Sequence, residues 1–193
     1  MRIKNFGRAA VLGVSLLLVL PACDETDCSS FPATFVDVEG VNLIPYSRQI
    51  STLLTGQVVR ANDLLLRLEL RERQYSASRP SRGGFAAWAD CSYPVPAYTE
   101  KIDSILVTSR SDYDAQHPAA TALNDLIRIT YRGGDIALQD LLATPQGVEV
   151  IKNQHLTVTA PPARSGTQQF QVRIHLVGGE VQESTIATVD LQP

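Results

Sequence analysis

Strict alternation of hydrophobic and polar residues is the feature that most limits how this chain can fold. In residues 64–75, leucines at the even positions 64, 66, 68 and 70 alternate mainly with charged side chains. In residues 169–176, the alternating hydrophobic residues are Phe170, Val172, Ile174 and Leu176. A period of two places such residues on one face of a β-strand. We therefore predict two strands, each with one hydrophobic and one polar face.

Shorter segments extend this pattern along the chain. Further strands are predicted at residues 35–41, 102–109, 127–131 and 156–159, the first of them ended by a turn at Gly40. A Gly178-Gly179 turn and a returning strand over residues 180–191 predict a hairpin whose inward residues are Val181, Ile186 and Val189. Short helical turns are expected at residues 123–126 and 135–142.

The spacing of these segments predicts the fold class. Several short strands separated by polar loops rich in Gly and Pro are typical of an antiparallel sandwich. We therefore predict an all-β, immunoglobulin-like β-sandwich with one or two short helical turns. A single domain is expected over residues 34–193, and no internal repeat is visible.

The first 22 residues have the three parts of a secretory signal. A basic start is followed by a hydrophobic run too short to span a bilayer as a helix, and Ala22 precedes Cys23. The run Leu20-Pro21-Ala22-Cys23 resembles the lipoprotein signal of bacteria, in which the cysteine becomes the lipidated first residue. That resemblance implies export, and anchoring through Cys23 by at least two acyl chains such as palmitate.

Residues 23–33 form an acidic, serine-containing tether by composition. Acidic residues directly after the lipid cysteine resemble the inner-membrane retention signal of enterobacteria and the surface-export signal of Bacteroidota. A plain soluble tether is the simplest alternative. We expect the outer membrane, facing either the periplasm or the surface.

The charge of the chain limits its partners. Three of the 17 basic residues and none of the 20 acidic residues lie in residues 1–22, so the remaining chain has a net charge of −6. This mildly acidic charge argues against a nucleic-acid partner, because phosphate binding needs clustered Lys and Arg. The sequence shows no second hydrophobic run of membrane-spanning length, so the lipid is the expected membrane anchor.

The chain has three cysteines. If Cys23 carries lipid, Cys28 and Cys91 remain as a pair in an oxidising compartment. A disulfide between them and two free thiols stay open as alternatives, because sequence gives no geometry. Structural zinc is not expected without a C-x-x-C motif or clustered histidines.

Residues 112–125 concentrate the chain's most suggestive polar side chains. Asp112, Asp114 and Asp125 are weak candidates for a Ca²⁺ site near His117. Turn and cap bonds, in which aspartate accepts backbone N–H groups, are the commoner role of such residues. We therefore expect no metal and no cofactor.

Motifs of known catalytic chemistry are absent from the sequence. No G-x-S-x-G, S-x-x-K or H-E-x-x-H occurs, so no enzyme activity is expected. His117 and His155 are predicted in loops and His175 on an outward strand face, all three solvated. Trp88, Tyr93 and Tyr98 offer either stacking surface for a ligand or packing residues. Arg67, Arg71 and Arg73 are predicted to form one solvated strand face.

A family resemblance covers most of the chain after the signal. It is carried by Ala89-Asp90-Cys91-Ser92, by residues 100–105 and 108–114, and by His117-Pro118-Ala119-Ala120 with Leu123-Asn124-Asp125-Leu126. These segments resemble a family of uncharacterised lipoproteins of Bacteroidota. The resemblance implies an exported all-β domain, with glycine expected where this chain has Ala120. The family supplies no activity that extends to this chain.

These observations favour a lipid-anchored envelope protein that binds or assembles with other molecules. Its expected partners are the membrane, through the lipid, and another envelope protein or a glycan. The alternative is an envelope hydrolase with a carboxylate-based site for a glycoside or peptide. A concave cleft with convergent, buried carboxylates would distinguish the second function from the first.

Overall fold

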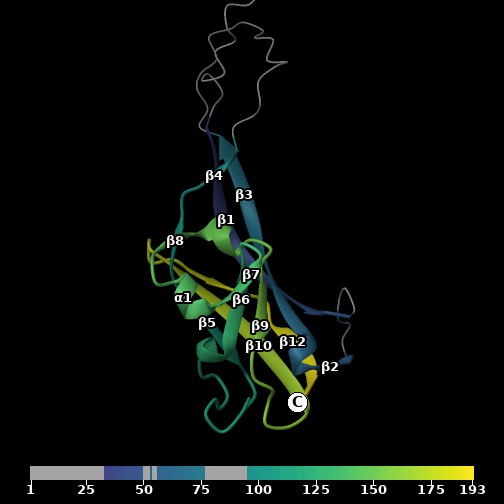
Figure 1. Cartoon of the computed structure of the whole chain (residues 1–193). Coiled ribbons are helices and arrows are strands. Elements are labelled where there is room, and N and C mark those ends of the chain that lie inside the picture. The colour runs from purple at the N-terminus through teal and green to yellow at the C-terminus, as the bar shows by residue number, and fades with distance from the viewer. Residues whose placement is uncertain (1–32, 50–52, 54–55, 77–94) are drawn as a thin grey trace, which may run out of the picture. The chain divides into compact units, whose positions relative to one another are not determined.

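The structure is a computed structural model that describes residues 33–49, 53, 56–76 and 95–193. All described residues belong to one compact unit. Within it, two six-stranded sheets enclose a single hydrophobic core (Figure 1). The predicted all-β sandwich is therefore confirmed.

The first sheet, sheet A, has the strand order β4-β1-β3-β9-β6-β7. Its strands are β1 (Thr34–Ser47), β3 (Leu64–Ser76), β4 (Ala97–Tyr98), β6 (Ile127–Tyr131), β7 (Gly134–Ala137) and β9 (His155–Val158). All its pairings are antiparallel except the short one between β1 and β4.

The second sheet, sheet B, has the order β2-β12-β10-β5-β8, and β11 also pairs with β10. Its strands are β2 (Val58–Arg60), β5 (Lys101–Ser109), β8 (Gln146–Gly147), β10 (Gly166–Leu176), β11 (Val181–Glu183) and β12 (Ala187–Gln192). Only the edge pairing of β2 with β12 is parallel. The described helical segments are short: η2 (Ala61–Asp63), η3 (Asn124–Leu126), α1 (Leu138–Leu141) and η4 (Val148–Ile151). None of the described helices is long and apolar enough to cross a membrane.

The alternating strands build the core as predicted. Leu64, Leu66 and Leu68 of β3 are at most 1% exposed. Phe170, Val172 and Ile174 of β10 are buried in the same core. Each fully buried side chain of this size contributes about 1.5–3 kcal/mol. The predicted strands at residues 102–109, 127–131 and 156–159 and the turn at 123–126 are also confirmed, to within one residue at their ends.

The predicted turn at Gly40 is wrong, because β1 continues through it to Ser47. The pairing with β3 shifts between Val38 and Gly40, which marks a β-bulge. A Cβ atom at position 40 would fall on the Arg71 side chain. Glycine in this strand therefore marks a bulge rather than a chain reversal.

The segment after β10 differs from the predicted single return strand. It divides into β11 and β12, and both pair with β10. Val181 and Ile186, predicted to face inward, are 43% and 37% exposed. Val189 is buried as predicted.

Polar residues take the inward positions because they complete the open edge of β1. The Gln182 Nε2 donates to the Val38 carbonyl at 3.1 Å. The Leu43 N–H donates to the Thr185 hydroxyl at 3.1 Å, and the Thr185 N–H donates to the Val41 carbonyl. These bonds join the two sheets and protect a strand edge that would otherwise be open to pairing.

The predicted helix over residues 135–142 is wrong in its first half, where the chain forms β7. Arg132 and Gly133 both have positive φ, 50° and 83°, so the β6–β7 loop is a two-residue hairpin turn. The chain therefore returns along β6, with Ile136 opposite Ile129. Only α1, a single turn, is helical.

Candidate functional site

Several predicted residues lie outside the described part of the chain. These residues are Cys23, Cys28, Trp88, Cys91 and Tyr93. Lipidation at Cys23 and the alternatives for the other two cysteines therefore stay predictions.

The loop over residues 110–125 is fixed to the core by Tyr113. This side chain is 1% exposed, and its hydroxyl donates to the Ala160 carbonyl at 2.6 Å. Its ring packs against Phe170, with 6.3 Å between the ring centroids. The loop is thus anchored at its centre, which fixes the polar residues on either side.

The loop aspartates accept hydrogen bonds from nearby groups of the same loop. Asp112 Oδ1 accepts the Ala119 N–H at 2.8 Å. Asp114 Oδ1 accepts the N–H groups of Gln116 and His117, each at 2.8 Å. The structure thus gives Asp112 and Asp114 the turn-forming bonds that were the alternative to metal binding. Among the described residues, no group of three or more Asp, Glu, His or Cys is arranged to hold a metal ion.

His117 is buried, with 7% of the residue exposed, so the prediction of a solvated histidine is wrong. Its Nδ1 lies 2.8 Å from Asp114 Oδ1, and its Nε2 lies 3.1 Å from both oxygens of Asp125. The hydrogen bond with Asp114 raises the pKa of His117 against the opposing effect of burial. Burial alone would raise the pKa of Asp114, but the bonds from His117 and the backbone lower it.

This arrangement is a structural clasp rather than a catalytic site. Both ring nitrogens of His117 already face carboxylates, so neither is free to accept a proton from a substrate. No described hydroxyl or thiol is hydrogen-bonded to the ring. The clasp, formed by Asp114, His117 and Asp125, links two parts of the loop in which the sequence suggested a Ca²⁺ site.

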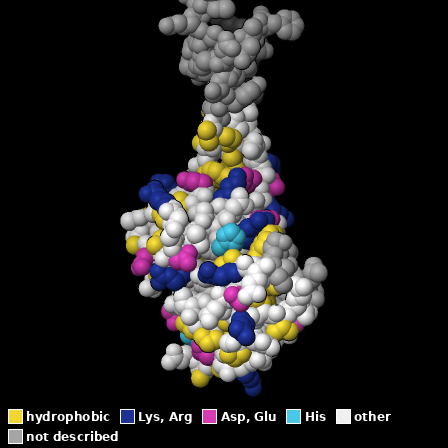
Figure 2. All heavy atoms as spheres, turned by 45° about the vertical axis from the view of Figure 1, so that its right-hand side comes forward, with side chains coloured by type: hydrophobic (Ala, Val, Ile, Leu, Met, Phe, Trp, Pro, Cys, Tyr) yellow, Lys and Arg dark blue, Asp and Glu magenta, His cyan; other side chains and the backbone are white. Residues whose placement is uncertain are grey.

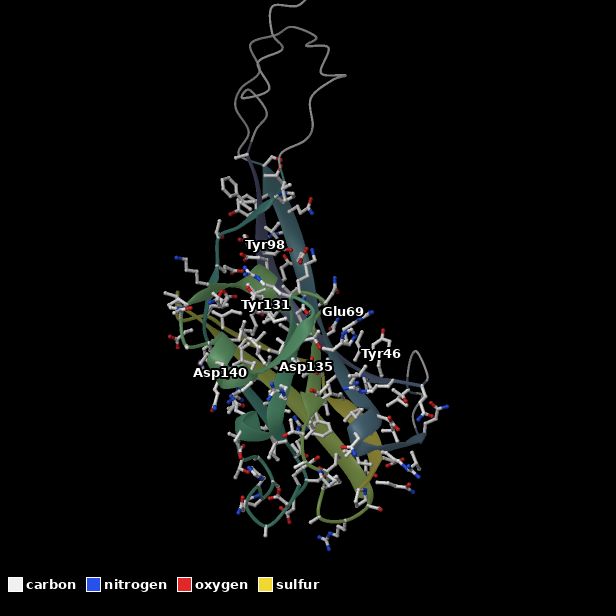
Figure 3. All side chains as sticks on the ribbon, in the orientation of Figure 1. Tyr46, Glu69, Tyr98, Tyr131, Asp135 and Asp140 are labelled. Atoms are coloured by element: carbon white, nitrogen blue, oxygen red, sulfur yellow. The ribbon has the colours of Figure 1, made fainter. Side chains whose placement is uncertain are left out.

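A different group of side chains meets on the outer face of sheet A. We call Tyr46, Arg67, Glu69 and His155 the sheet A platform. They come from three neighbouring strands, β1, β3 and β9, and Arg67 lies directly opposite His155. Figure 3 labels Tyr46 and Glu69 beside the β1–β3 pair. Figure 2 shows the face on this side, where a histidine is surrounded by basic, acidic and hydrophobic side chains.

Contacts within the platform hold its side chains in place. The Arg67 guanidinium lies over the Tyr46 ring, 4.8 Å from its centroid, and forms an ion pair with Glu69. The His155 ring stands edge-on to Tyr46, with 6.3 Å between centroids. Arg67 is 30% exposed, so it is not part of the solvated face predicted with Arg71 and Arg73.

The platform presents a neutral histidine beside a cation. Burial lowers the pKa of His155, and the charge of Arg67 lowers it further. His155 lies in β9 and not in the predicted loop, which explains its partial burial. The Arg67 Nε is the one buried side-chain nitrogen or oxygen of the described residues that lacks a hydrogen-bond partner. Arg67 is therefore held mainly by its cation–π contact with Tyr46 and its ion pair with Glu69.

A second polar group joins β3, β4 and the residue after η4. The Tyr98 hydroxyl donates to Glu72 Oε1 at 2.6 Å, and Lys152 Nζ donates to Glu72 Oε2 at 2.8 Å and to the Tyr98 oxygen at 2.9 Å. Burial would raise the pKa of Glu72, but Lys152 and Tyr98 lower it. Burial raises the pKa of Tyr98, whose position Figure 3 labels. The polar ends of Glu72, Tyr98 and Lys152 are bonded to one another. The group is a closed polar contact that packs Tyr98, not a stacking surface for a ligand.

Two carboxylates line one cleft of about 290 Å³. Glu100 Oε2 accepts the Val38 N–H at 3.0 Å, and Glu180 Oε1 accepts from Gln182 at 2.6 Å. Burial raises the pKa of Glu100, and the charges of Glu180 and Asp37 add to that effect. Glu100 thus bonds directly to the edge of β1 at Val38. Glu180 bonds to Gln182, the side chain that donates to the Val38 carbonyl on the same edge.

Comparison with known proteins finds no match: no family model matches the chain, and neither does a curated protein or a solved structure. The resemblance to lipoproteins of Bacteroidota therefore stays an expectation from the sequence.

Proposed function

We propose that this chain is a lipid-anchored binding module of the bacterial envelope, and that its sheet A platform contacts a protein partner. The observation that carries this proposal is the contact of Tyr46, Arg67 and His155 on one outward sheet face. Tyr and Arg are the residues most enriched where binding energy concentrates in interfaces.

The geometry of the platform favours a protein over a glycan. A sugar ring stacks on an open aromatic face, whereas the Tyr46 ring has a guanidinium over it and an imidazole edge beside it. Side chains that are already held lose little entropy on binding, which favours affinity. A neutral His155 is also less costly to desolvate than a charged one.

The location of the protein is proposed from its first 28 residues. The signal ending at Cys23 favours export and lipid anchoring, and the acidic tether favours the outer membrane. Mass spectrometry of the mature N-terminus should find Cys23 carrying a diacylglyceryl group. A Cys23→Ala variant should be released from membranes, and full retention of that variant would contradict the anchor.

The platform is tested by site-specific photo-crosslinking in the native envelope. A photoreactive phenylalanine analogue at position 46 should give one discrete adduct with a protein. The same analogue at Thr188, exposed on β12 of sheet B, is the matched control and should not give it. The adduct at position 46 should disappear when Arg67→Glu reverses the central charge. Equal adducts from both positions, or no effect of Arg67→Glu, would contradict the proposal.

The alternative function, an envelope hydrolase, is supported by the cleft that Glu100 and Glu180 line. A carboxyl group with a raised pKa is suited to act as a general acid. We favour the binding module because both carboxylates already bond to protein groups. Hydrolysis of a glycoside or peptide by the purified protein, abolished by Glu100→Gln at unchanged melting temperature, would support the hydrolase instead.

A further inference from the structure

A second recess lies on the outer face of sheet B, away from the platform strands. It has a volume of about 210 Å³ and is formed where β5 and β10 pair. Its lining residues are Leu106, Thr108, Arg110, Ala120, Gln171 and Arg173. Thr108 lies opposite Gln171 and Leu106 opposite Arg173, so the rigid strand register sets the spacing of the lining.

The polar groups of this recess are mainly hydrogen-bond donors. Arg173 binds Glu183, with Nε and Nη2 at 2.8 Å and 2.7 Å from the same carboxylate oxygen. The Arg110 side chain and the Thr108 hydroxyl have no partner among the described residues, although the Arg110 backbone N–H bonds to Gln169. Glu183 offsets one of the two guanidinium charges, which leaves a single net positive charge at the recess.

We propose that this recess binds one carboxylate group of a ligand, with Arg110 as its main ion-pair partner. A planar guanidinium matches a carboxylate with two parallel hydrogen bonds. The single net charge matches a monoanion better than a phosphate dianion. The volume is below the about 300–1,000 Å³ of sites that enclose drug-sized molecules, so it suits a small acidic group.

The rim of the recess is held in a strained conformation. Ala120 has a φ of 64°, which is uncommon for a residue other than glycine. This is the position where the family resemblance led us to expect glycine. Its N–H donates to the Ser109 carbonyl at 2.7 Å, which holds the loop against the end of β5. Strain of this kind persists only where surrounding contacts enforce it, and here it fixes one wall of the recess.

Amide NMR of the purified protein tests the proposal, with N-acetylglycine, which carries one carboxylate, as the probe at constant ionic strength. We expect saturable shifts at Thr108, Arg110 and Gln171. Arg110→Gln should weaken binding about tenfold to a hundredfold, as loss of a hydrogen bond to a charged group does. Arg110→Lys should restore part of that loss because it keeps the charge without the planar fork.

Matched controls separate this site from general attraction of anions. Arg48→Gln removes another exposed arginine and should leave the affinity unchanged. N-acetylglycinamide, which lacks the carboxylate, should not bind, and inorganic phosphate should bind no more tightly than the probe. Shifts that do not saturate, an equal loss with Arg48→Gln, or tighter binding of phosphate would each overturn the proposal. Because the platform lies on sheet A, failure here would leave the proposed protein contact untouched.

Discussion

The two histidine regions of this molecule use the same side chain in opposite ways. In the clasp, His117 lies between Asp114 and Asp125, and its pKa is raised. On the platform, His155 lies beside Arg67, and its pKa is lowered. One histidine therefore favours its charged form in the folded protein, and the other favours its neutral form.

The difference teaches where chemistry is available in this fold. The clasp joins residues that are close in sequence, and its polar atoms are already bonded to each other and to the backbone. The platform joins residues from three strands and faces outward. Polar residues that cluster in sequence here build a loop, whereas those that meet only through the fold form an outward-facing group of side chains.

The largest expected effect is a difference in the free energy of unfolding between a variant in the loop over residues 110–125 and a variant in the platform. Tyr113→Ala should lower the free energy of unfolding by about 3–5 kcal/mol, because it empties a fully buried site. Tyr46→Ala should lower it by about 1 kcal/mol, through lost cation–π contact and partial burial. Urea unfolding of both variants measures the difference. Tyr113→Phe is the control and should lose only about 1 kcal/mol, for the bond to Ala160. Similar losses from the two alanine variants would contradict the division into a core-anchored loop and an outward surface.

Local pattern was enough to predict the strands that build the core. The alternation in β3 and β10 predicted both that these segments are strands and which of their faces is buried, because the period of two is a property of the strand itself. It failed for β11, where Gln182 faces inward to bond to the Val38 carbonyl. That bond joins residues far apart in sequence, so hydrophobicity alone could not predict it.

The sheet A platform could not be predicted from the sequence, because its residues also meet only through long-range strand pairing. Arg67 was predicted to be solvated, since its strand neighbours 71 and 73 are also arginines. Only the pairing of β3 with β9 brings it opposite His155, and only β1 brings Tyr46 under it. Conversely, the sequence showed that His117 was near aspartates, but not that Tyr113 draws the loop into the core.

The next expected effect is that His117 and His155 make the stability of the protein depend on pH in opposite directions. The raised pKa of His117 means that its stabilisation is fully present below its unfolded value of 6.5, and is lost as pH rises through the folded pKa. The lowered pKa of His155 means that the wild-type protein loses stability as pH falls through 6.5, because the unfolded chain takes up the proton first. His117→Gln should therefore be most destabilising near about pH 5, and His155→Gln should be relatively stabilising there.

Thermal unfolding of both variants at about pH 5 and about pH 8 measures this contrast. His175→Gln is the control, since His175 lies on the outer face of β10 and has no carboxylate partner among the described residues. Its melting temperature should follow that of the wild-type protein. If His117→Gln and His155→Gln change stability in the same direction at low pH, the opposite roles of the two histidines are disproved.

The smallest expected effect isolates the electrostatic part of the platform. Arg67→Met keeps a side chain over Tyr46 but removes the charge, so stability should change by less than about 1 kcal/mol. The pKa of His155 should rise part of the way toward its usual value, because the charge of Arg67 lowers it while burial, the larger cause, remains. NMR titration of the His155 ring protons measures this shift, and the pKa of His117 should not move. Arg71→Met, an exposed arginine on the same strand, is the control and should leave His155 unchanged. An unmoved His155 pKa in Arg67→Met would mean that burial alone keeps this imidazole neutral, and that the platform is joined by packing without electrostatic coupling.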